Sequence, residues 1–135
     1  MPQKLKNWAG NVTFRAARVH RPASVAELRH LVARSRKARV LGSGHSFTDL
    51  ADSPEDLIVL DGLPAVVELD TAAATVRVSA HLRYAELGRR LHAQGFAVHN
   101  LASLPHISIA GSCATATHGS GDANGNLATA VSALE

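Results

Sequence analysis

The sequence predicts an α+β fold in which short strands alternate with two helices. Three observations predict it. Apolar residues recur at helical spacing in two segments, 24–35 and 83–93. A short run of large apolar residues, 57–60, is typical of a buried strand, and two alternating runs near residues 65–79 are typical of a hairpin. A hydrophobic content of 46% with 19% charged residues is that of a globular chain.

The first half of the chain predicts a strand, a helix and two further strands. Val12–Val19 alternates loosely and predicts a short strand. Ser24 with Glu27 three residues later forms a capping box, which predicts a helix ending near Ser35. The strands expected after it are residues 39–41 and 57–60, with a turn at 61–62.

The second half predicts a hairpin, a helix and a long loop. The expected elements are strands at 65–69 and 75–79, a helix at 83–93 capped by Gly95, and a short strand at 96–98. Residues 100–126 carry little charge and much Gly, Ser, Thr and Ala, which predicts an ordered binding loop. Residues 127–134 are expected to begin a further helix or strand, and the chain is expected to continue beyond them.

Composition narrows the classes of partner. The net charge is +3, and the densest basic run, 34–39, is interpreted as a solvated helix end because no aromatic residues interleave it, as a nucleic-acid surface would require. The single cysteine, Cys113, excludes an internal disulfide and fits a reduced, cytoplasmic location. Residues 1–6 lack the apolar run of a signal peptide, and no apolar run reaches the length of a membrane span. We expect neither nucleic-acid nor membrane partners.

Two small-residue stretches are the main functional signal. Residues 40–47, Val-Leu-Gly-Ser-Gly-His-Ser-Phe, place two glycines and two serines around His45, and residues 110–121 form a second such stretch. Glycine allows close approach to the main chain, and the inward amides of such loops bind anions. From the residues alone, His45 is a metal ligand, a general base, a covalent attachment point or an ordinary loop residue.

Several common site types do not fit. A dinucleotide fingerprint fails because Phe47 stands where the third glycine is needed, and no P-loop or nucleophile elbow occurs. The eight histidines show no zinc spacing, so we expect no metal. The acidic residues at positions 49, 52, 55 and 56 are interpreted as solvated turn residues, and Cys113 as a small buried apolar residue. Ser103, taken alone, is interpreted as a turn residue.

These motifs together resemble a known family. Residues 40–47, 102–108 (Ala-Ser-Leu-Pro-His-Ile-Ser), 111–112 and 116–121 (Ala-Thr-His-Gly-Ser-Gly) resemble the FAD domain of the vanillyl-alcohol-oxidase family. The opening Asn7–Asn11 (Asn-Trp-Ala-Gly-Asn) is similar to its alditol oxidase branch, which is related to the sugar-lactone oxidases. The resemblance covers residues 1–135 and implies the N-terminal part of a PCMH-type FAD-binding domain: a small α/β subdomain, then the start of a second α+β subdomain.

The resemblance also implies a flavin site. The first loop would wrap the FAD pyrophosphate, and His45 would be bonded to the 8α-methyl group of the flavin as the single tether. Ser103 would lie by the flavin ring near the substrate, as a catalytic residue. The residues expected to bind the cofactor are Leu41, Gly42, Ser43, Gly44, His45, Ser46, Ser103, Ser108, Gly111, Thr115, Ala116, Thr117 and His118.

The implied activity is FAD-dependent oxidation of a terminal CH–OH group of a sugar alcohol to an aldehyde, with dioxygen reduced to hydrogen peroxide. An aldonolactone oxidase or dehydrogenase of the same fold, and a flavin-binding module without activity of its own, remain alternatives. The substrate domain of the family lies outside these 135 residues. We therefore expect the segment alone to be inactive, weakly stable and a poor FAD binder.

Overall fold

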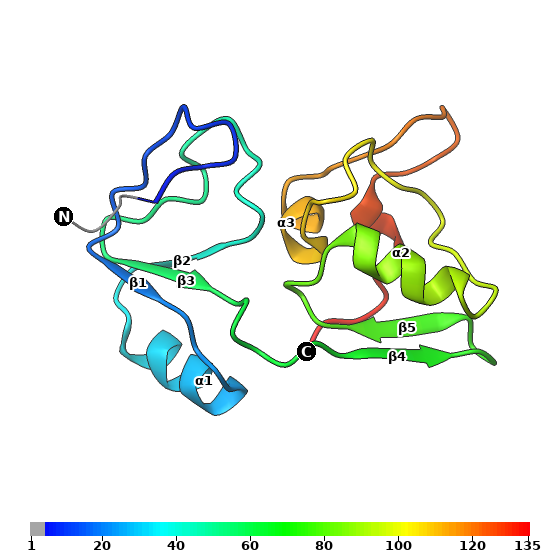
Figure 1. Ribbon diagram of the computed structural model, residues 1–135, viewed down its shortest axis with the longest axis horizontal. Helices are drawn as coiled ribbons and strands as arrows, with labels where there is room; N and C mark the ends of the chain where they lie inside the picture. The colour runs from blue at the N-terminus through cyan, green and yellow to red at the C-terminus, as the bar shows by residue number, and fades with distance from the viewer. Residues whose placement is uncertain (1–4) are drawn as a thin grey trace. The chain divides into compact units, whose positions relative to one another are not determined.

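The computed structural model describes residues 5–135, which fall into two compact units, residues 5–64 and Ala65–Glu135 (Figure 1). The mixture of short strands and helices confirms the predicted α+β class. Each unit has its own hydrophobic cluster, and each is described separately below.

The first unit is built on a three-stranded parallel sheet. Its strands are β1 (Arg18–His20), β2 (Ala38–Leu41) and β3 (Asp56–Val59), in the order β1-β3-β2. All four residues of β3 are buried, as expected for a central parallel strand rich in Leu, Ile and Val. The apolar run predicted as a buried strand is therefore confirmed as the centre of the sheet.

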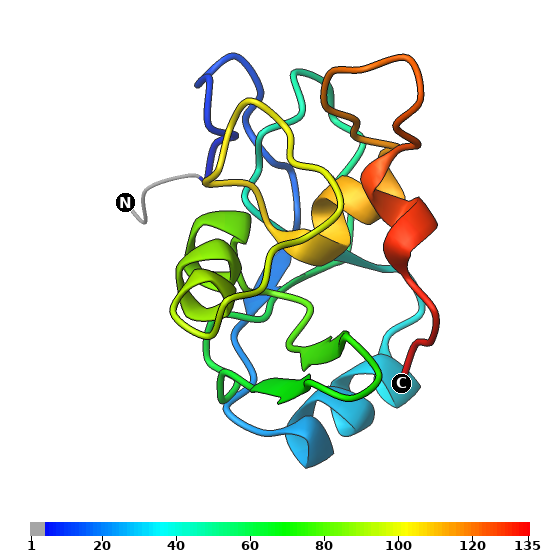
Figure 2. The same ribbon diagram turned by 90° about the vertical axis from the view of Figure 1, so that its right-hand side faces the viewer.

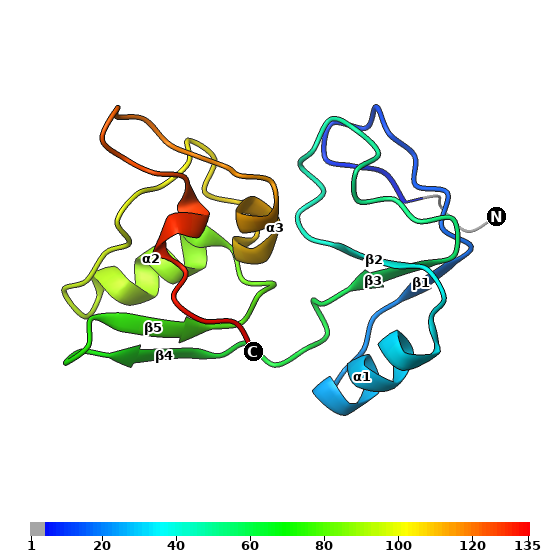
Figure 3. The same ribbon diagram turned by 180° about the vertical axis from the view of Figure 1, so that it is seen from behind.

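Helix α1 (Val25–Arg34) connects β1 to β2 and begins at the predicted capping box. The Ser24 hydroxyl accepts a hydrogen bond from the Glu27 N–H at 3.1 Å, and the Glu27 carboxylate accepts one from the Ala23 N–H at 2.8 Å. Leu28 and Leu31 are half-buried, whereas Val25 is exposed. Figure 3 shows α1 on one side of the sheet and the long loops of this unit on the other.

The core of the first unit joins the N-terminal segment to the sheet. Phe14, Leu41, Leu57 and Val59 form its buried cluster. Leu57 and Val59 share one face of β3 because side chains alternate along a strand, and Ile58 points to the opposite face. Phe14 therefore attaches the segment before β1 to the sheet face that also holds the end of β2.

The second unit pairs a hairpin with a helix. Strands β4 (Val67–Asp70) and β5 (Thr75–Val78) are antiparallel, and α2 (Tyr84–His92) lies over them (Figure 2). Two shorter helices follow, α3 (Ile109–Ala114) and the 3₁₀ helix η1 (Leu127–Ala130). The buried cluster consists of Tyr84, Leu87, Leu91, Ile107 and Leu127, with β4 and β5 side chains packed against it. The predicted hairpin and second helix are confirmed.

The strand expected at Val12–Val19 is mostly wrong. Only its last two residues belong to β1, and Thr13 makes an isolated bridge with Lys6. The backbone N–H of Arg15 donates to the Asp52 carboxylate at 3.0 and 3.1 Å. A side chain therefore takes the hydrogen bond that a neighbouring strand would otherwise accept.

Two expectations about residues 96–126 are also wrong. Phe96 and Val98 pack on the second cluster without forming a strand, and the Phe96 N–H donates to the Leu91 carbonyl at 3.0 Å, closing the end of α2. The segment expected as a loop contains α3, whose composition of small residues gives no amphipathic period. The Ile109 and Ala110 amides at its start donate to backbone carbonyls elsewhere in the unit, so tertiary contacts specify this short helix.

Asp56 was expected in a solvated turn, but it begins β3 and is only 2% exposed. Arg18 donates to both of its carboxylate oxygens, at 2.7 and 3.0 Å, and His20 Nε2 lies 2.8 Å from one of them. The hydrogen bond from Arg18, followed by that from His20, holds the pKa of the Asp56 carboxyl well below its usual range. The pair links β1 to β3 at their matched positions Arg18 and Asp56.

We expect Leu57→Ala to lower the free energy of unfolding of the full-length protein by about 2–4 kcal/mol, because it leaves a cavity at a fully buried position, 0% exposed. Urea unfolding measures the change. Val25→Ala, at a position 61% exposed, is the matched control and should change stability by about 0.5 kcal/mol or less. Equal losses in the two variants would contradict the central role of β3.

Asp56 should also make stability depend on pH. Because its pKa is lower in the folded chain, the unfolded chain binds the proton first, and the stabilisation is present above about pH 4 and lost as the pH falls toward the folded pKa. Asp56→Asn should be less stable at pH 7 and should show a flatter decline below about pH 4. Asp61→Asn, in the exposed pair with Arg21, is the control. If the stability of Asp56→Asn and that of the unsubstituted protein changed with pH in the same way, the pH dependence could not be assigned to Asp56.

Candidate functional site

The first glycine loop follows β2 directly. Leu41, the last residue of β2, is buried in the first cluster and fixes where the loop begins. Residues 42–47 then leave the sheet, and Gly44 adopts a positive φ of 65°, a conformation that favours glycine. The sheet thus sets the starting point of the loop, and Gly44 sets its turn.

Residues 7–12, here called the polar clamp, hold this loop through its carbonyl groups. The backbone N–H of Trp8 donates to the Gly44 carbonyl at 2.8 Å. Asn7 Nδ2 donates to the Ser46 carbonyl at 2.9 Å, and Asn11 Nδ2 donates to the Phe47 carbonyl at 3.0 Å. Three carbonyls of the loop therefore face the polar clamp.

Hydrogen bonds within the polar clamp hold its own conformation. Asn7 is 4% exposed, and its Oδ1 accepts the Val12 N–H at 3.0 Å while its Nδ2 also donates to Asn11 Oδ1 at 2.7 Å. One buried amide side chain therefore ties together both ends of the segment and the loop.

This arrangement orients the amides of the loop. In a trans peptide, the N–H points opposite to the C=O of the preceding residue. Because the carbonyls of Gly44, Ser46 and Phe47 face the polar clamp, the N–H groups that follow them in sequence point away from it. Such a set of outward amides, beside a serine hydroxyl and a glycine, suits a negatively charged oxygen.

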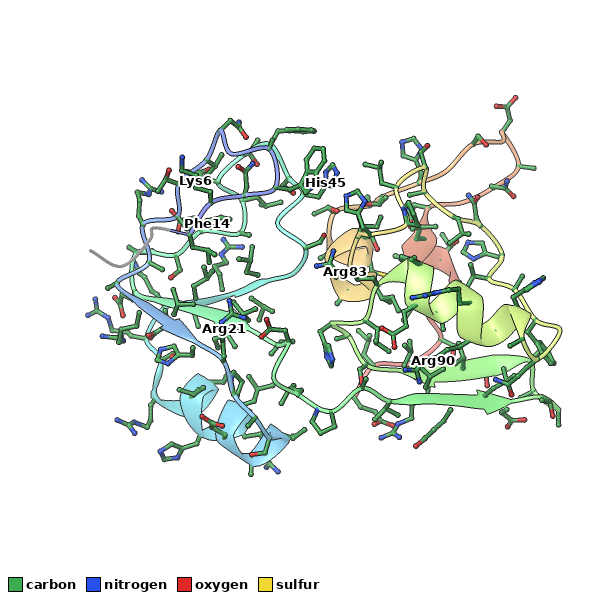
Figure 4. The ribbon with its side chains drawn as sticks, viewed as in Figure 1. Lys6, Phe14, Arg21, His45, Arg83 and Arg90 are labelled. Atoms are coloured by element: carbon green, nitrogen blue, oxygen red, sulfur yellow. The ribbon has the colours of Figure 1, made fainter. Side chains whose placement is uncertain are left out.

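His45 lies between two of the held carbonyls, and aromatic rings hold its side chain. The Trp8 indole stacks on the imidazole with ring centroids 4.5 Å apart and an interplanar angle of 13°. Phe47 meets the same imidazole edge-on, at 5.8 Å and 85°. Figure 4 labels His45 on the loop after β2, with Phe14 inside the same unit.

In the second unit, the segment 105–108 covers the start of α2. The Tyr84 and Ala85 amides, at the N-terminus of the helix, donate to the Ile107 and Pro105 carbonyls at 3.2 and 2.8 Å. Arg83, labelled in Figure 4, donates through Nη1 to the His106 carbonyl at 2.7 Å. These contacts replace the side-chain cap that α2 lacks. They also place Ser108 at the N-cap position of α3.

Ser108 and Gly111 lie in close contact. A Cβ at Gly111 would stand 2.6 Å from the Ser108 hydroxyl, so only glycine fits there without a shift of the serine. The N–H groups of Ile109 and Ala110 donate to the Leu82 and Ala80 carbonyls, at 2.8 and 3.0 Å. The first two amides of α3 are therefore bonded within the unit, and Ser108 itself is buried, at 4% exposed.

The expected residues 115–118 form an irregular turn after α3. Thr115 Oγ1 donates to the Gly111 carbonyl at 3.0 Å and lies 3.1 Å from Thr117 Oγ1. Ala116 has a positive φ of 52°, and the Thr117 N–H donates to the Ser112 carbonyl at 3.0 Å. His118 Nδ1 lies 2.9 Å from the Gly119 carbonyl.

This turn also contacts the segment that carries Ser103. A Cβ at Gly119 would stand 2.2 Å from the Leu101 carbonyl and 2.7 Å from Asn100 Oδ1. Ser103 itself is exposed, in a bend. The structure therefore brings Ser108, Gly111 and residues 115–118 together within the second unit. In the first unit, residues 41–46 lie together in one loop.

Tyr84 and Cys113 are neighbours in the second unit. Burial and the Cys113 thiol raise the pKa of Tyr84 to about 12, so this phenol stays protonated at neutral pH. Cys113 is half-buried, in partial agreement with its interpretation as a small apolar residue. The Tyr84 phenol is therefore not poised to act as a base.

Two features of the described residues bear on the class of site. Across residues 5–135, no cluster of three or more His, Cys, Asp or Glu side chains is arranged to hold a metal ion. Among the helices in the described part of the chain, none has the length and apolar character needed to cross a membrane.

No role in the site was predicted for Asn7, Trp8 and Asn11. In the structure, residues 7–11 form a turn, and Trp8 is 61% exposed. The available signal was the pairing of two asparagines with a tryptophan outside any amphipathic element.

Comparisons with known proteins agree with this geometry. The chain is 54% identical to the alditol oxidase of Streptomyces sp. (strain IKD472 / FERM P-14339), over 100% of the chain and 33% of that protein. It is 34% identical to the L-gulono-1,4-lactone dehydrogenase of Mycobacterium tuberculosis (strain ATCC 25618 / H37Rv), over 95% of the chain and 31% of that protein. The chain thus spans about a third of the length of these relatives.

The fold has a solved counterpart. The crystal structure of cholesterol oxidase from B. sterolicum matches 87% of this chain and 24% of its own, with a TM-score of 0.76 and 22% identity. The family model described as FAD binding domain matches residues 16–135. These matches confirm the expected PCMH-type fold. The chain belongs to the FAD binding domain family.

Proposed function

We propose that this chain is part of an FAD-dependent alditol oxidase that converts a terminal CH–OH group of a sugar alcohol to an aldehyde and reduces dioxygen to hydrogen peroxide. The observation that carries the proposal is the 54% identity to an alditol oxidase along the whole chain. The first loop and the residues around it supply the matching chemistry.

The residues of the first loop fit a flavin nucleotide. FAD, when bound, supplies the two-electron chemistry of the reaction. The glycines at 42 and 44 allow close approach of a pyrophosphate, and the amides that point away from the polar clamp would donate to its oxygens. Leu41, Ser43 and Ser46 would complete this part of the site.

His45 would hold the cofactor covalently. It would contribute a ring nitrogen to a C–N bond with the 8α-carbon of FAD. The imidazole N–H proton, together with one proton and two electrons from the 8α-methyl group, would pass to dioxygen, which would be reduced to hydrogen peroxide. A neutral imidazole is a suitable nucleophile near pH 7. The Trp8 stack, at 4.5 Å, supports the proposal because it already restrains the imidazole.

The second unit would bind the rest of the cofactor. Ser108, Gly111 and the segment Thr115, Ala116, Thr117 and His118 would contact the pyrophosphate and the ribityl chain. The clash that any Cβ at Gly111 would make supports a backbone role for this residue. Ser103 would act near the substrate, and its exposed position in a bend is compatible with that role.

A lactone oxidoreductase of the same fold is the second candidate. The 34% identity to an L-gulono-1,4-lactone dehydrogenase favours it, and a dehydrogenase would pass its electrons to an acceptor other than dioxygen. The third alternative is a flavin-binding module without activity of its own, which would need the rest of the protein for turnover.

We expect His45→Ala to abolish covalent flavin. Denaturing mass spectrometry with peptide mapping of the full-length protein should find one FAD on the peptide that holds residue 45 and none in the variant. His30→Ala, on the exposed face of α1, is the control and should keep the adduct. A folded protein that holds FAD without any adduct would contradict the tether and leave the fold unaffected.

We expect the full-length protein to form hydrogen peroxide with xylitol or sorbitol. Peroxide would be followed by a coupled peroxidase assay, and reduction of an artificial electron acceptor would be followed in parallel. Turnover of L-gulono-1,4-lactone with the artificial acceptor alone would favour the lactone dehydrogenase instead.

A further inference from the structure

Four contacts from the polar clamp converge on the residues around His45. Three are the hydrogen bonds to the carbonyls of Gly44, Ser46 and Phe47, between 2.8 and 3.0 Å long. The fourth is the indole of Trp8 on the imidazole face. The peptide group before His45, the peptide groups after Ser46 and Phe47, and the plane of the His45 ring are therefore held by one short segment.

The loop needs such support because of its own composition. Glycine flanks His45 at position 44, and a glycine in a loop leaves more backbone freedom than any other residue. A histidine that must meet one carbon atom of a ligand gains rate when its ring is held in the reactive orientation beforehand. The polar clamp provides that restraint from outside the loop.

The position of Trp8 does not suggest a core residue. Its side chain is 61% exposed, and it is not among the residues that form or pack against the buried cluster of the first unit. The stacked imidazole, with an interplanar angle of 13°, is an aromatic contact of defined geometry. A large, exposed aromatic side chain with this contact serves the orientation of its partner more than the stability of the fold.

We propose that Trp8, with Asn7 and Asn11, is a positioning residue for His45 and accelerates formation of the covalent bond to FAD. This inference rests on the proposed function, since it requires the tether. The Trp8 indole fixes the plane of the His45 ring. The Asn7 side chain fixes the Ser46 carbonyl, and the Trp8 backbone N–H fixes the Gly44 carbonyl. None of the three takes part in the bond that forms.

The test follows covalent incorporation in time. Full-length apoprotein, produced without flavin, is mixed with FAD, and the covalent fraction and the total bound FAD are measured separately by denaturing mass spectrometry and by absorbance. We expect Trp8→Ala to slow incorporation by about tenfold to a hundredfold at unchanged total FAD. Trp8→Phe should recover part of the rate because it keeps a ring on the imidazole. Asn11→Asp, which loses the bond to Phe47, should be slowed as well.

Val25→Ala is the matched control, since Val25 is as exposed as Trp8, at 61%, and lies on α1. It should incorporate FAD at the unsubstituted rate. Incorporation by Trp8→Ala at the unsubstituted rate would overturn the inference. A parallel loss of total FAD and covalent FAD would also overturn it, because that is the result of a binding or folding role. Absence of any adduct in the unsubstituted protein would instead refute the proposed tether.

Discussion

The burial of β3 between its two parallel neighbours is the constraint on which the first unit depends. Leu57 and Val59 hold Phe14 and Leu41 on one face of the strand. Phe14 fixes the segment that leads from the polar clamp, and Leu41 fixes the start of the glycine loop. The hydrophobic cluster thus sets the distance between clamp and loop, and the hydrogen bonds only refine it. A polar site of irregular backbone can be held in place in this way because its two anchors are apolar and buried.

In the second unit, backbone carbonyl groups rather than apolar side chains hold the starts of the helices. Helix α2 begins at Tyr84 without a side-chain cap, and the Pro105 and Ile107 carbonyls accept from its first amides. The same residues lead into α3, whose own first amides are also bonded within the unit. Helix starts are common anion sites, because their amides lack partners inside the helix. Here the protein uses these amides itself, so the first amides of α2 and α3 are not available to an anion.

Much of the fold followed from local patterns. The capping box at Ser24, the apolar run 57–60 and the hairpin were predicted because each has a strong local signal, and all three are confirmed. Helix α3 was missed because its formation depends on carbonyls near residues 80–82, which no local pattern reveals. Asp56 was taken for a turn residue because the arginine that pairs with its buried carboxylate lies 38 positions away in sequence. For the candidate site, the loop 41–46 was predicted from its glycines, whereas the proposed role of Trp8 depends on a contact with His45 that no local pattern reveals.

The contact at Gly119 has a consequence for how the second unit can vary. The position of its missing Cβ lies 2.2 Å from the Leu101 carbonyl, so the two loops meet there with their main chains in direct apposition. Loops that share such a junction cannot be exchanged one at a time between related proteins. A graft that replaces residues 101–106 must carry residues 117–119 with it, and the smallest transferable module of this region is the pair of loops.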